Sequence, residues 1–195
     1  MRVVAGRLGG RQLRAVPGKA TRPTSDRVRE ALFAILGDRV VDARVLDLFA
    51  GTGALAIEAL SRGARAAVLV EPAPAAAAVI RANLGDLGLD NLAIVRRTRA
   101  ETYLRNQRDG PFDLVLLDPP YTTPVGLVAG LLARLAATAL SPDAVVVLES
   151  AGRGEPPPWP AGFVPAGPRR YGDTALHMAV WPGEATGRRD VPPPR

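Results

Sequence analysis

The segment 45–55, Val-Leu-Asp-Leu-Phe-Ala-Gly-Thr-Gly-Ala-Leu, constrains the fold of this chain more than any other stretch. It opens with an apolar run, broken only by Asp47, that predicts a short buried strand. Gly51 and Gly53 follow, and they permit a sharp turn and a close approach to a ligand because they have no Cβ atom. The alanine-rich residues 54–60 then predict a helix. A strand, a glycine turn and a helix in this order predict the ligand-binding corner of an open α/β sheet.

The glycines by themselves do not identify the ligand, because they also fit the loose Gly-x-Gly-x-x-Ala pattern of dinucleotide-binding proteins. Asp47, four positions before the first glycine, suits a cationic head such as the amino group of a methionine better than a pyrophosphate. A later motif, residues 118–121 (Asp-Pro-Pro-Tyr), has no role in a dinucleotide fold. The two motifs together resemble those of class I S-adenosylmethionine-dependent methyltransferases that modify an exocyclic amine, which disfavours an NAD oxidoreductase.

A second apolar strand is predicted over residues 66–70, and it ends in Glu71. A carboxylate at the tip of the second strand is placed to accept hydrogen bonds from both ribose hydroxyls of a nucleoside cofactor. The alternative is an acid that merely begins a helix, because Pro72 and Pro74 follow and an alanine-rich helix is predicted from Pro74. The strand, the acid and its position after the glycine corner favour the ribose role.

A further strand, 112–117, leads into Asp118-Pro119-Pro120-Tyr121. Hydrogen bonds from an exocyclic amine to the Asp118 carboxylate and the Pro119 carbonyl would hold the amine toward the sulfonium methyl group. They would also stabilise the positive charge that develops on nitrogen. Pro120 stiffens the turn, and the Tyr121 ring offers a face on which an extruded base can stack. The alternative is a proline turn at the end of a strand with a surface tyrosine.

Composition limits the classes of function that remain. The 195 residues, 47% of them apolar, suffice for one domain with a substantial core, and the net charge of +6 points to a polyanionic partner such as nucleic acid. The chain has no cysteine, which excludes disulfides and disfavours pyrimidine C5 methylation through a cysteine adduct. The single histidine, His177, excludes a histidine-rich metal site and is expected to pack in a strand. With no signal-like or membrane-spanning segment, we expect a cytoplasmic monomer without metal.

Residues 1–23 form a basic leader. Two strand-like pieces, 2–6 and 11–15, flank Gly9-Gly10 and predict a β-hairpin. The cations of the leader that we assign to RNA binding are Arg2, Arg7, Arg11, Arg14 and Arg22, with Lys19 nearby. The leader is thus either an arm that grips RNA phosphates, which would make affinity depend on salt, or a solvated terminus.

The segment 21–36 carries the closest resemblance to a known family. Thr24 or Ser25 can cap a helix here, with Asp26 in its first turn. The run Arg-Pro-Thr-x-Asp-Arg-Val-Arg-Glu, followed by Leu-Phe, resembles the RsmD family of bacterial methyltransferases that modify guanine N2 in small-subunit ribosomal RNA. The Arg-Tyr-Gly-Asp-Thr run at 170–174 also resembles this family, and the resemblance extends over residues 1–182.

The resemblance implies S-adenosylmethionine as cofactor and a guanine in 16S ribosomal RNA of the small ribosomal subunit as target. The cofactor contacts that it implies are Thr24, Asp47, Gly51, Gly53, Glu71 and Ala100, and the base contacts are Asp118, Pro119, Pro120 and Tyr121. One departure concerns Arg99, which stands where the family carries an aspartate beside the adenine. The adenine then needs another acceptor, such as a backbone carbonyl or Glu101, and the arginines of 96–99 can instead add to an RNA-binding face.

The expected fold class is α/β: a Rossmann-like class I methyltransferase with a mainly parallel seven-stranded sheet, helices on both faces and the small basic hairpin. We expect the methyltransferase domain to span 24–182 and residues 183–195 to be a disordered tail. Within the domain we predict a strand at 92–95, a helix at 124–140, a strand at 144–148, an irregular loop at 151–168 and a final strand at 175–181.

Two alternative functions remain open. An adenine-N6 DNA methyltransferase would share the Asp-Pro-Pro-Tyr chemistry, although the chain has no separate target-recognition domain. A non-catalytic RNA-binding or assembly protein could use the same fold. Arg169 and Arg170 either contact RNA or lie at a solvated hairpin tip.

Overall fold

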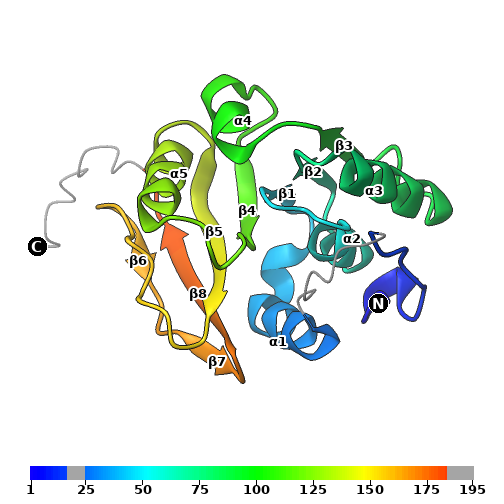
Figure 1. The fold of residues 1–195 in the computed structure, drawn as a ribbon, viewed down its shortest axis with the longest axis horizontal. Coiled ribbons are helices and arrows are strands. Elements are labelled where there is room, and N and C mark those ends of the chain that lie inside the picture. The colour runs from blue at the N-terminus through cyan, green and yellow to red at the C-terminus, as the bar shows by residue number, and fades with distance from the viewer. Residues whose placement is uncertain (17–24, 184–195) are drawn as a thin grey trace, which may run out of the picture.

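The computed structural model describes residues 1–16 and 25–183, and a single twisted sheet forms its centre (Figure 1). The strands are β1 (Arg44–Asp47), β2 (Ala66–Val70), β3 (Ala93–Arg96), β4 (Phe112–Leu117), β5 (Leu140–Ala151), β6 (Val164–Pro165), β7 (Arg169–Tyr171) and β8 (Thr174–Trp181). Their lateral order is β3-β2-β1-β4-β5-β8-β6, and β7 also pairs with β8. The first five strands are parallel, while β8 runs antiparallel to β5. The strand order reverses between β1 and β4, which is where open α/β sheets bind ligands.

The predicted seven-stranded sheet is confirmed as seven lateral positions, but the last position is divided between two strands. Val164 of β6 lies opposite Val180, and Arg169 of β7 lies opposite Leu176, so both strands pair with successive parts of β8. The prediction of an irregular loop over 151–168 is therefore wrong at its end, where β6 forms. A strand that contains Pro165 fits only at a sheet edge, because proline has no N–H group to donate.

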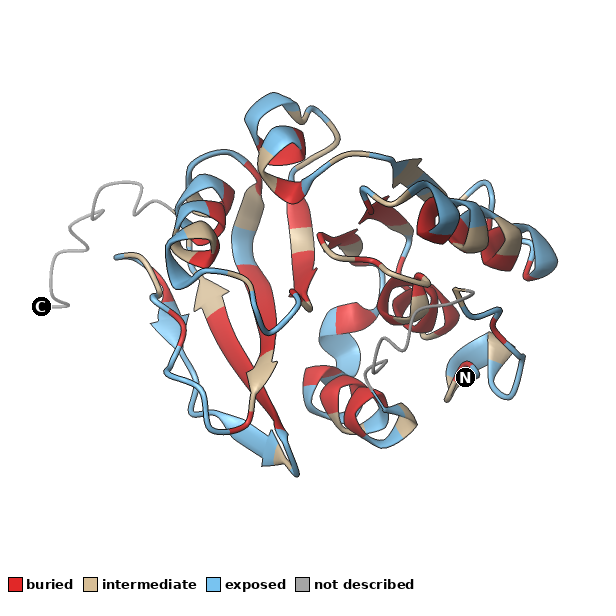
Figure 2. Cartoon of the chain, viewed as in Figure 1, coloured by how far each residue is buried: buried red, intermediate tan, exposed pale blue. Residues whose placement is uncertain are grey.

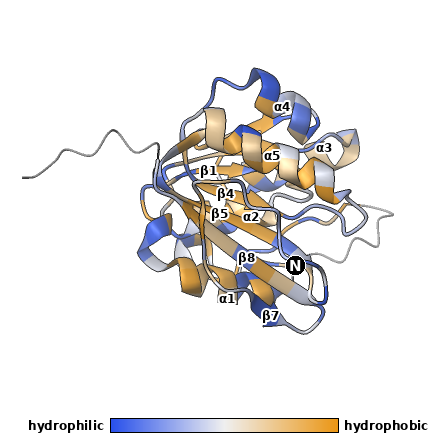
Figure 3. Cartoon of the chain, turned by 90° about the vertical axis from the view of Figure 1, so that its left-hand side faces the viewer, coloured by the Kyte–Doolittle hydropathy of each residue, from blue (hydrophilic) through white to orange (hydrophobic). Residues whose placement is uncertain are grey.

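Helices cover both faces of the sheet, as predicted (Figure 1). They are α1 (Asp26–Leu36), α2 (Ala54–Ser61), α3 (Pro74–Asp86), α4 (Ala100–Asn106) and α5 (Val125–Thr138). Side chains alternate between the two faces along a strand, so Val45 packs with α1, α2 and α3 while Leu46 packs with α4 and α5. Buried residues accordingly concentrate on the central strands and on the helix sides that face them, and much of the central sheet is hydrophobic, whereas β7 is hydrophilic (Figures 2 and 3).

Helix α1 begins as its sequence predicts. The Ser25 hydroxyl accepts a hydrogen bond from the Val28 N–H at 3.2 Å, which caps the helix, and Asp26 lies in the first turn, where the helix dipole favours an acid. Leu32 and Phe33 are each 1% exposed. These two apolar residues dock the helix on the sheet beside the glycine corner.

The boundary between α5 and β5 differs from the prediction. The helix ends at Thr138 rather than at residue 140, and β5 begins at Leu140, well before the predicted start at 144. The Phe112 N–H donates to the Ala139 carbonyl at 2.8 Å, and the β4–β5 register shifts between Phe112 and Leu114. Pairing with the buried β4 therefore extends the strand over residues whose own sequence does not predict one.

The leader is attached to the domain over residues 1–16. The predicted hairpin is reduced to one pair, Arg2 with Gln12, and a 3-10 turn, Gly6–Leu8, replaces the simple glycine turn. Val3 is fully buried, and the N–H groups of Val4 and Ala5 donate to the Glu58 carboxylate of α2 at 2.7 and 3.0 Å. The connection between the two pieces is bonded to α2 as well, because the Leu8 N–H donates to the Ser61 hydroxyl at 3.0 Å.

Part of the predicted leader and most of the predicted tail lie outside the residues that the structure describes. The end of the leader and the tail from 184 onward are outside the described ranges, so the boundaries at 23 and 183 stay predictions. Within residues 1–16 and 25–183, no helix has both the length and the hydrophobicity needed to cross a bilayer.

Candidate functional site

A cleft of about 540 Å³ lies at the carboxyl ends of the central strands. Its walls include the glycine corner after β1, the acid after β2 and the Asp-Pro-Pro-Tyr motif after β4. The motif residues that line it are Gly51, Glu71, Asp118, Pro119, Pro120 and Tyr121. The fold thus brings together two motifs that are far apart in the sequence.

The two glycines of the corner have different roles. Both have positive φ angles, 56° at Gly51 and 81° at Gly53, which side chains other than glycine rarely adopt. A Cβ atom at Gly53 would lie 3.1 Å from the Leu69 side chain, so this glycine permits close packing of α2 on the sheet. A Cβ atom at Gly51 would meet no atom within 4 Å, so this glycine leaves open space for a ligand.

Glu71 holds the corner from the second strand. Its Oε2 accepts a hydrogen bond from the Gly51 N–H at 3.0 Å, and its Oε1 accepts one from the Ala73 N–H at 2.8 Å. Each carboxylate oxygen has a second lone pair, so Glu71 can also accept hydrogen bonds from ligand hydroxyls. The residue is 9% exposed and lines the cleft, in keeping with the predicted ribose role.

Asp47 is a buried acid beneath the corner. It is fully buried, and neither carboxylate oxygen has a hydrogen-bond partner with regular geometry. Burial raises the pKa of Asp47 from its ordinary 3.8 to about 7, with a further rise from the charges of Asp118 and Glu71, while the N–H groups of Ala56 and Phe49 partly oppose this. A cationic group in the cleft would relieve this cost, because it favours the ionised carboxylate.

These features fit S-adenosylmethionine. The negative charge of Asp47, which lies beneath the corner and does not itself line the cleft, suits the cationic amino-acid tail. The acceptors of Glu71 suit the ribose, and the open space at Gly51 lets the cofactor approach the backbone closely. In the part of the chain that the structure describes, no three acidic or histidine side chains gather into a metal-binding group.

The Asp-Pro-Pro-Tyr motif forms a rigid turn at the end of β4. Asp118 is partly buried and Pro119 is buried, and the turn is closed by a hydrogen bond from the Thr123 N–H to the Pro120 carbonyl at 2.8 Å. Tyr121 is 53% exposed, and its hydroxyl lies 3.3 Å from Oγ1 of Thr174 at the start of β8. One edge of the ring is therefore anchored while much of its surface stays free for stacking.

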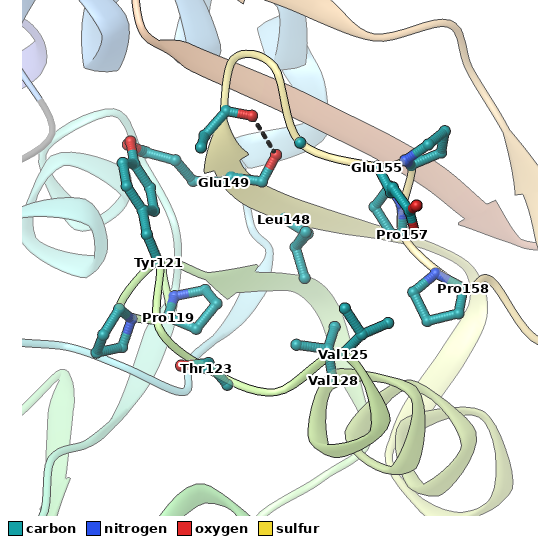
Figure 4. Close-up of a pocket in the computed structure, with 15 residues that line it drawn as sticks. Pro119, Tyr121, Thr123, Val125, Val128, Leu148, Glu149, Glu155, Pro157 and Pro158 are labelled. Atoms are coloured by element: carbon teal, nitrogen blue, oxygen red, sulfur yellow. Dashed lines mark hydrogen bonds between the residues drawn. The ribbon is translucent and has the colours of Figure 1, made fainter.

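A second hollow, of about 250 Å³, adjoins the cleft on the other side of this turn (Figure 4). It lies between the turn, the start of α5 and the loop 154–158. Its walls are mainly apolar, with Val125 and Val128 from α5 and Leu148 from β5. Four residues line both hollows: Pro119, Pro120, Tyr121 and Glu149.

The residues around Arg99 do not form the acidic adenine contact of the family pattern. Arg99 is exposed before α4, and Ala100, the first residue of α4, is packed in the core and does not line the cleft. Arg96 pairs with Asp109 at 2.6 Å, and this hydrogen bond holds the pKa of Asp109 below its ordinary value. The Arg96 side chain is therefore held by an ion pair within the domain.

The leader cations have different surroundings. Arg14 pairs with Asp86 of α3 at 2.7 Å, and Arg11 donates to the Asp86 carbonyl. Arg2 approaches Asp26 at 3.8 Å, while Arg7 is exposed in the 3-10 turn. Arg22 and the predicted cofactor contact Thr24 lie outside the described residues.

Several structural residues of the site were not predicted from the sequence. Asn83 of α3 donates to the Thr52 carbonyl of the glycine corner at 3.0 Å and accepts from the Arg14 N–H at 2.8 Å. An asparagine within an alanine-rich helix was the available signal, because asparagine disfavours helix interiors. His177 packs as predicted, hydrogen-bonded to Ser150 at 3.0 Å, and burial lowers the pKa of this histidine.

The strand order and the glycine corner define the class I methyltransferase fold. Solved structures agree: “Putative methyltransferase yhhF” from Escherichia coli superposes with a TM-score of 0.83 at 34% identity, covering 93% of this chain and 97% of that one.

The sequence comparisons identify the family. The model of the family described as Conserved hypothetical protein 95 matches residues 1–180, and the chain belongs to this family. “Putative rRNA methyltransferase YlbH” of Bacillus subtilis is 44% identical over 123 residues, 62% of this chain and 67% of that protein. Ribosomal RNA small subunit methyltransferase D of Escherichia coli K12 is 41% identical over 121 residues, 62% of this chain and 60% of that protein. The resemblance to the RsmD family is thereby confirmed, although the aligned segments span only about two thirds of these relatives.

Proposed function

We propose that this protein transfers a methyl group from S-adenosylmethionine to the exocyclic N2 amine of a guanine in 16S ribosomal RNA. The observation that carries the proposal is the meeting of Gly51, Glu71 and Asp118 in one cleft. The names of the relatives, which specify ribosomal RNA methylation, support the same substrate class.

The cofactor site would be shared between two acids. Asp47 would bind the amino group of the methionine tail, and Glu71 would accept hydrogen bonds from the ribose hydroxyls while keeping the Gly51 amide in place. The cofactor supplies a methyl group that is already activated on a positively charged sulfur. The protein therefore needs no nucleophile of its own, which agrees with a chain that lacks cysteine.

The amine would be positioned by the turn after β4. The Asp118 carboxylate and the Pro119 carbonyl would each accept a hydrogen bond from the amine and hold its nitrogen toward the methyl group. As the nitrogen–carbon bond forms and the carbon–sulfur bond breaks, positive charge would develop on the nitrogen, and the fixed negative charge of Asp118 would stabilise it until the amine releases its proton to water. Tyr121 would stack on the extruded base.

The leader would contribute phosphate contacts through Arg2, Arg7, Arg11 and Arg14. The attachment of residues 1–16 to α2 and α3 supports this role, because it fixes these cations relative to the cleft. The protein would act in the cytoplasm on the small subunit or an assembly intermediate. It would act as a monomer, and light scattering of the purified protein would test this oligomeric state.

The experiment is methyl transfer from labelled S-adenosylmethionine, with undermethylated small subunits, naked ribosomal RNA and duplex DNA offered in parallel. We expect N2-methylguanosine from a ribosomal substrate, identified by mass spectrometry of the labelled nucleoside. Label in DNA adenine would replace the proposal by an adenine-N6 activity. Cofactor binding without any label would point to a binding or assembly role.

A further inference from the structure

Glu149 is a buried acid that the proposed transfer does not use. It is 7% exposed and lies near the carboxyl end of β5, where it lines both hollows beside the Asp-Pro-Pro-Tyr turn. Figure 4 shows its side chain extending toward the hydroxyl end of Tyr121. Glu149 therefore presents a carboxylate to the space in which the base would bind.

The strand registers place Glu149 beside the proposed base contacts. Leu117, the last residue of β4, pairs with Leu148 of β5, so Asp118 and Glu149 directly follow a paired position on two adjacent strands, whose spacing is about 4.8 Å. Asp118 and Glu149 both line the larger cleft, so the two acids border the same space.

The pairing with β8 places Glu149 beside Tyr121 as well. Glu149 lies opposite Leu176 of β8, and Thr174, two residues earlier in β8, projects from the same face. Thr174 is the residue that lies 3.3 Å from the Tyr121 hydroxyl. Glu149 therefore adjoins the ring that is proposed to stack on the base.

The chemistry of guanine matches this pair of acceptors. Its Watson–Crick edge carries the N2 amine and, directly beside it, an N1–H group. Adenine instead presents an unprotonated N1, which is an acceptor. An ionised carboxylate can only accept hydrogen bonds. It therefore favours the guanine edge, which has an N1–H to donate, over the adenine edge, whose N1 carries only a lone pair.

We propose that Glu149 accepts the N1–H of the target guanine and thereby selects guanine, an inference that rests on the proposed function. Asp118 and Pro119 hold the amine that is methylated, and Glu149 holds the neighbouring ring nitrogen. Glu149 acts as a specificity residue through direct contact with the base.

The test compares two bases at the target position. The RNA that becomes methylated is prepared with either guanine or 2,6-diaminopurine there. Diaminopurine keeps the 2-amine but has an unprotonated N1. We expect wild-type protein to prefer guanine by at least about a hundredfold in kcat/KM. With diaminopurine the Glu149 carboxylate would face an N1 that has no hydrogen to donate, and such a mismatch in a buried site discriminates strongly. In Glu149→Gln the amide can donate to an unprotonated N1, so the preference should fall at least about tenfold.

Controls separate specificity from general damage. Glu155→Gln makes the same chemical change at an exposed residue of the smaller hollow and should leave the preference unchanged. Glu149→Asp keeps a carboxylate and should keep the preference even if its rate is lower. Calorimetry should find cofactor affinity within about threefold of wild type in all three variants.

The outcomes distinguish this inference from the proposed function. An equal loss of activity on both bases in Glu149→Gln, or no loss at all, would overturn the role of Glu149 while leaving guanine methylation established. Failure of wild-type protein to form N2-methylguanosine on any RNA would overturn both.

Discussion

Arg29 and Glu58 form a buried ion pair that joins α1 to α2 beneath the leader. Both side chains are fully buried, and Nε of Arg29 lies 3.5 Å from Oε2 of Glu58. Arg29 also donates to the Arg2 carbonyl, and Glu58 also accepts from Arg62 at 2.8 Å. This network fixes residues 1–5 to the domain, and so it sets where the leader cations lie.

The first prediction concerns this network. Glu58→Ala should lower the free energy of unfolding by about 3 to 5 kcal/mol, because it removes the buried countercharge of Arg29 and leaves only the partly exposed Asp26 at 2.9 Å, and because it removes the acceptor of two backbone N–H groups. Chemical denaturation measures the loss. Glu30→Ala on the exposed side of α1 is the matched control and should change stability by less than about 0.5 kcal/mol. Equal effects at both positions would contradict the structural role of Glu58.

The second prediction concerns Asp47 and pH. Because the pKa of Asp47 is about 7 in the folded protein and 3.8 ordinarily, the folded state retains a proton that the unfolded state loses in this range. The free energy of unfolding should therefore fall as pH rises from about 4 to 7, by up to roughly 4 kcal/mol. Asp47→Asn should remove this slope and stabilise the cofactor-free protein at pH 8.

The same substitution should weaken cofactor binding, because the amide gives no negative charge to the methionine amino group. Calorimetry at pH 8 measures the affinity, and denaturation at pH 5 and 8 measures the slope. Asp90→Asn, at an exposed acid, is the control and should leave both unchanged. A slope that survives in Asp47→Asn would show that another group titrates.

The third prediction concerns Asp118. Asp118→Ala should abolish methyl transfer while cofactor affinity stays within about tenfold of wild type, or 1.4 kcal/mol, because the proposed role of Asp118 is to hold the amine and not the cofactor tail. Asp118→Asn keeps one acceptor oxygen and should retain partial activity. Transfer assays and calorimetry are run on the same preparations, and joint loss of binding and transfer in a folded variant would refute the assignment.

The fourth prediction concerns Glu71. Glu71→Ala removes the acceptor of the Gly51 and Ala73 N–H groups and the proposed ribose contacts. Cofactor affinity should fall by about 10- to 150-fold, the range for hydrogen bonds to a charged group. Glu155→Ala, exposed and outside the larger cleft, should bind normally. A Glu71→Ala strain with full function would favour a non-catalytic role.

The fifth prediction concerns the leader. Arg14→Ala breaks a pair with Asp86 whose side chains are about half exposed, so it should cost no more than about 1 kcal/mol of stability. RNA affinity should nevertheless fall, and the slope of log K against log salt should drop by about 1 if Arg14 contacts a phosphate. Filter binding at several salt concentrations measures this. Arg105→Ala, exposed on α4, should leave the slope intact.

Local sequence determined much of this protein. The strand, glycine turn and helix at 45–60 follow from the apolar run before Asp47 and from the positive φ angles that Gly51 and Gly53 alone adopt easily. Ser25 caps α1 as predicted, because its hydroxyl can accept a hydrogen bond from an N–H of the first helical turn, which has no partner within the helix. Interactions between near neighbours in the chain dominate at these positions, so a short sequence is sufficient to predict them.

Only the tertiary structure decided which distant residues meet. The early start of β5 depends on pairing with β4, and β6 depends on the exposed edge of β8. The burial of Glu58 with Arg29, the contact of Asn83 with the glycine corner and the place of Glu149 beside Tyr121 depend on strand order and register. A charged side chain has the same appearance in the sequence whether solvent or a buried partner surrounds it, and only the packed fold fixes which of the two it is.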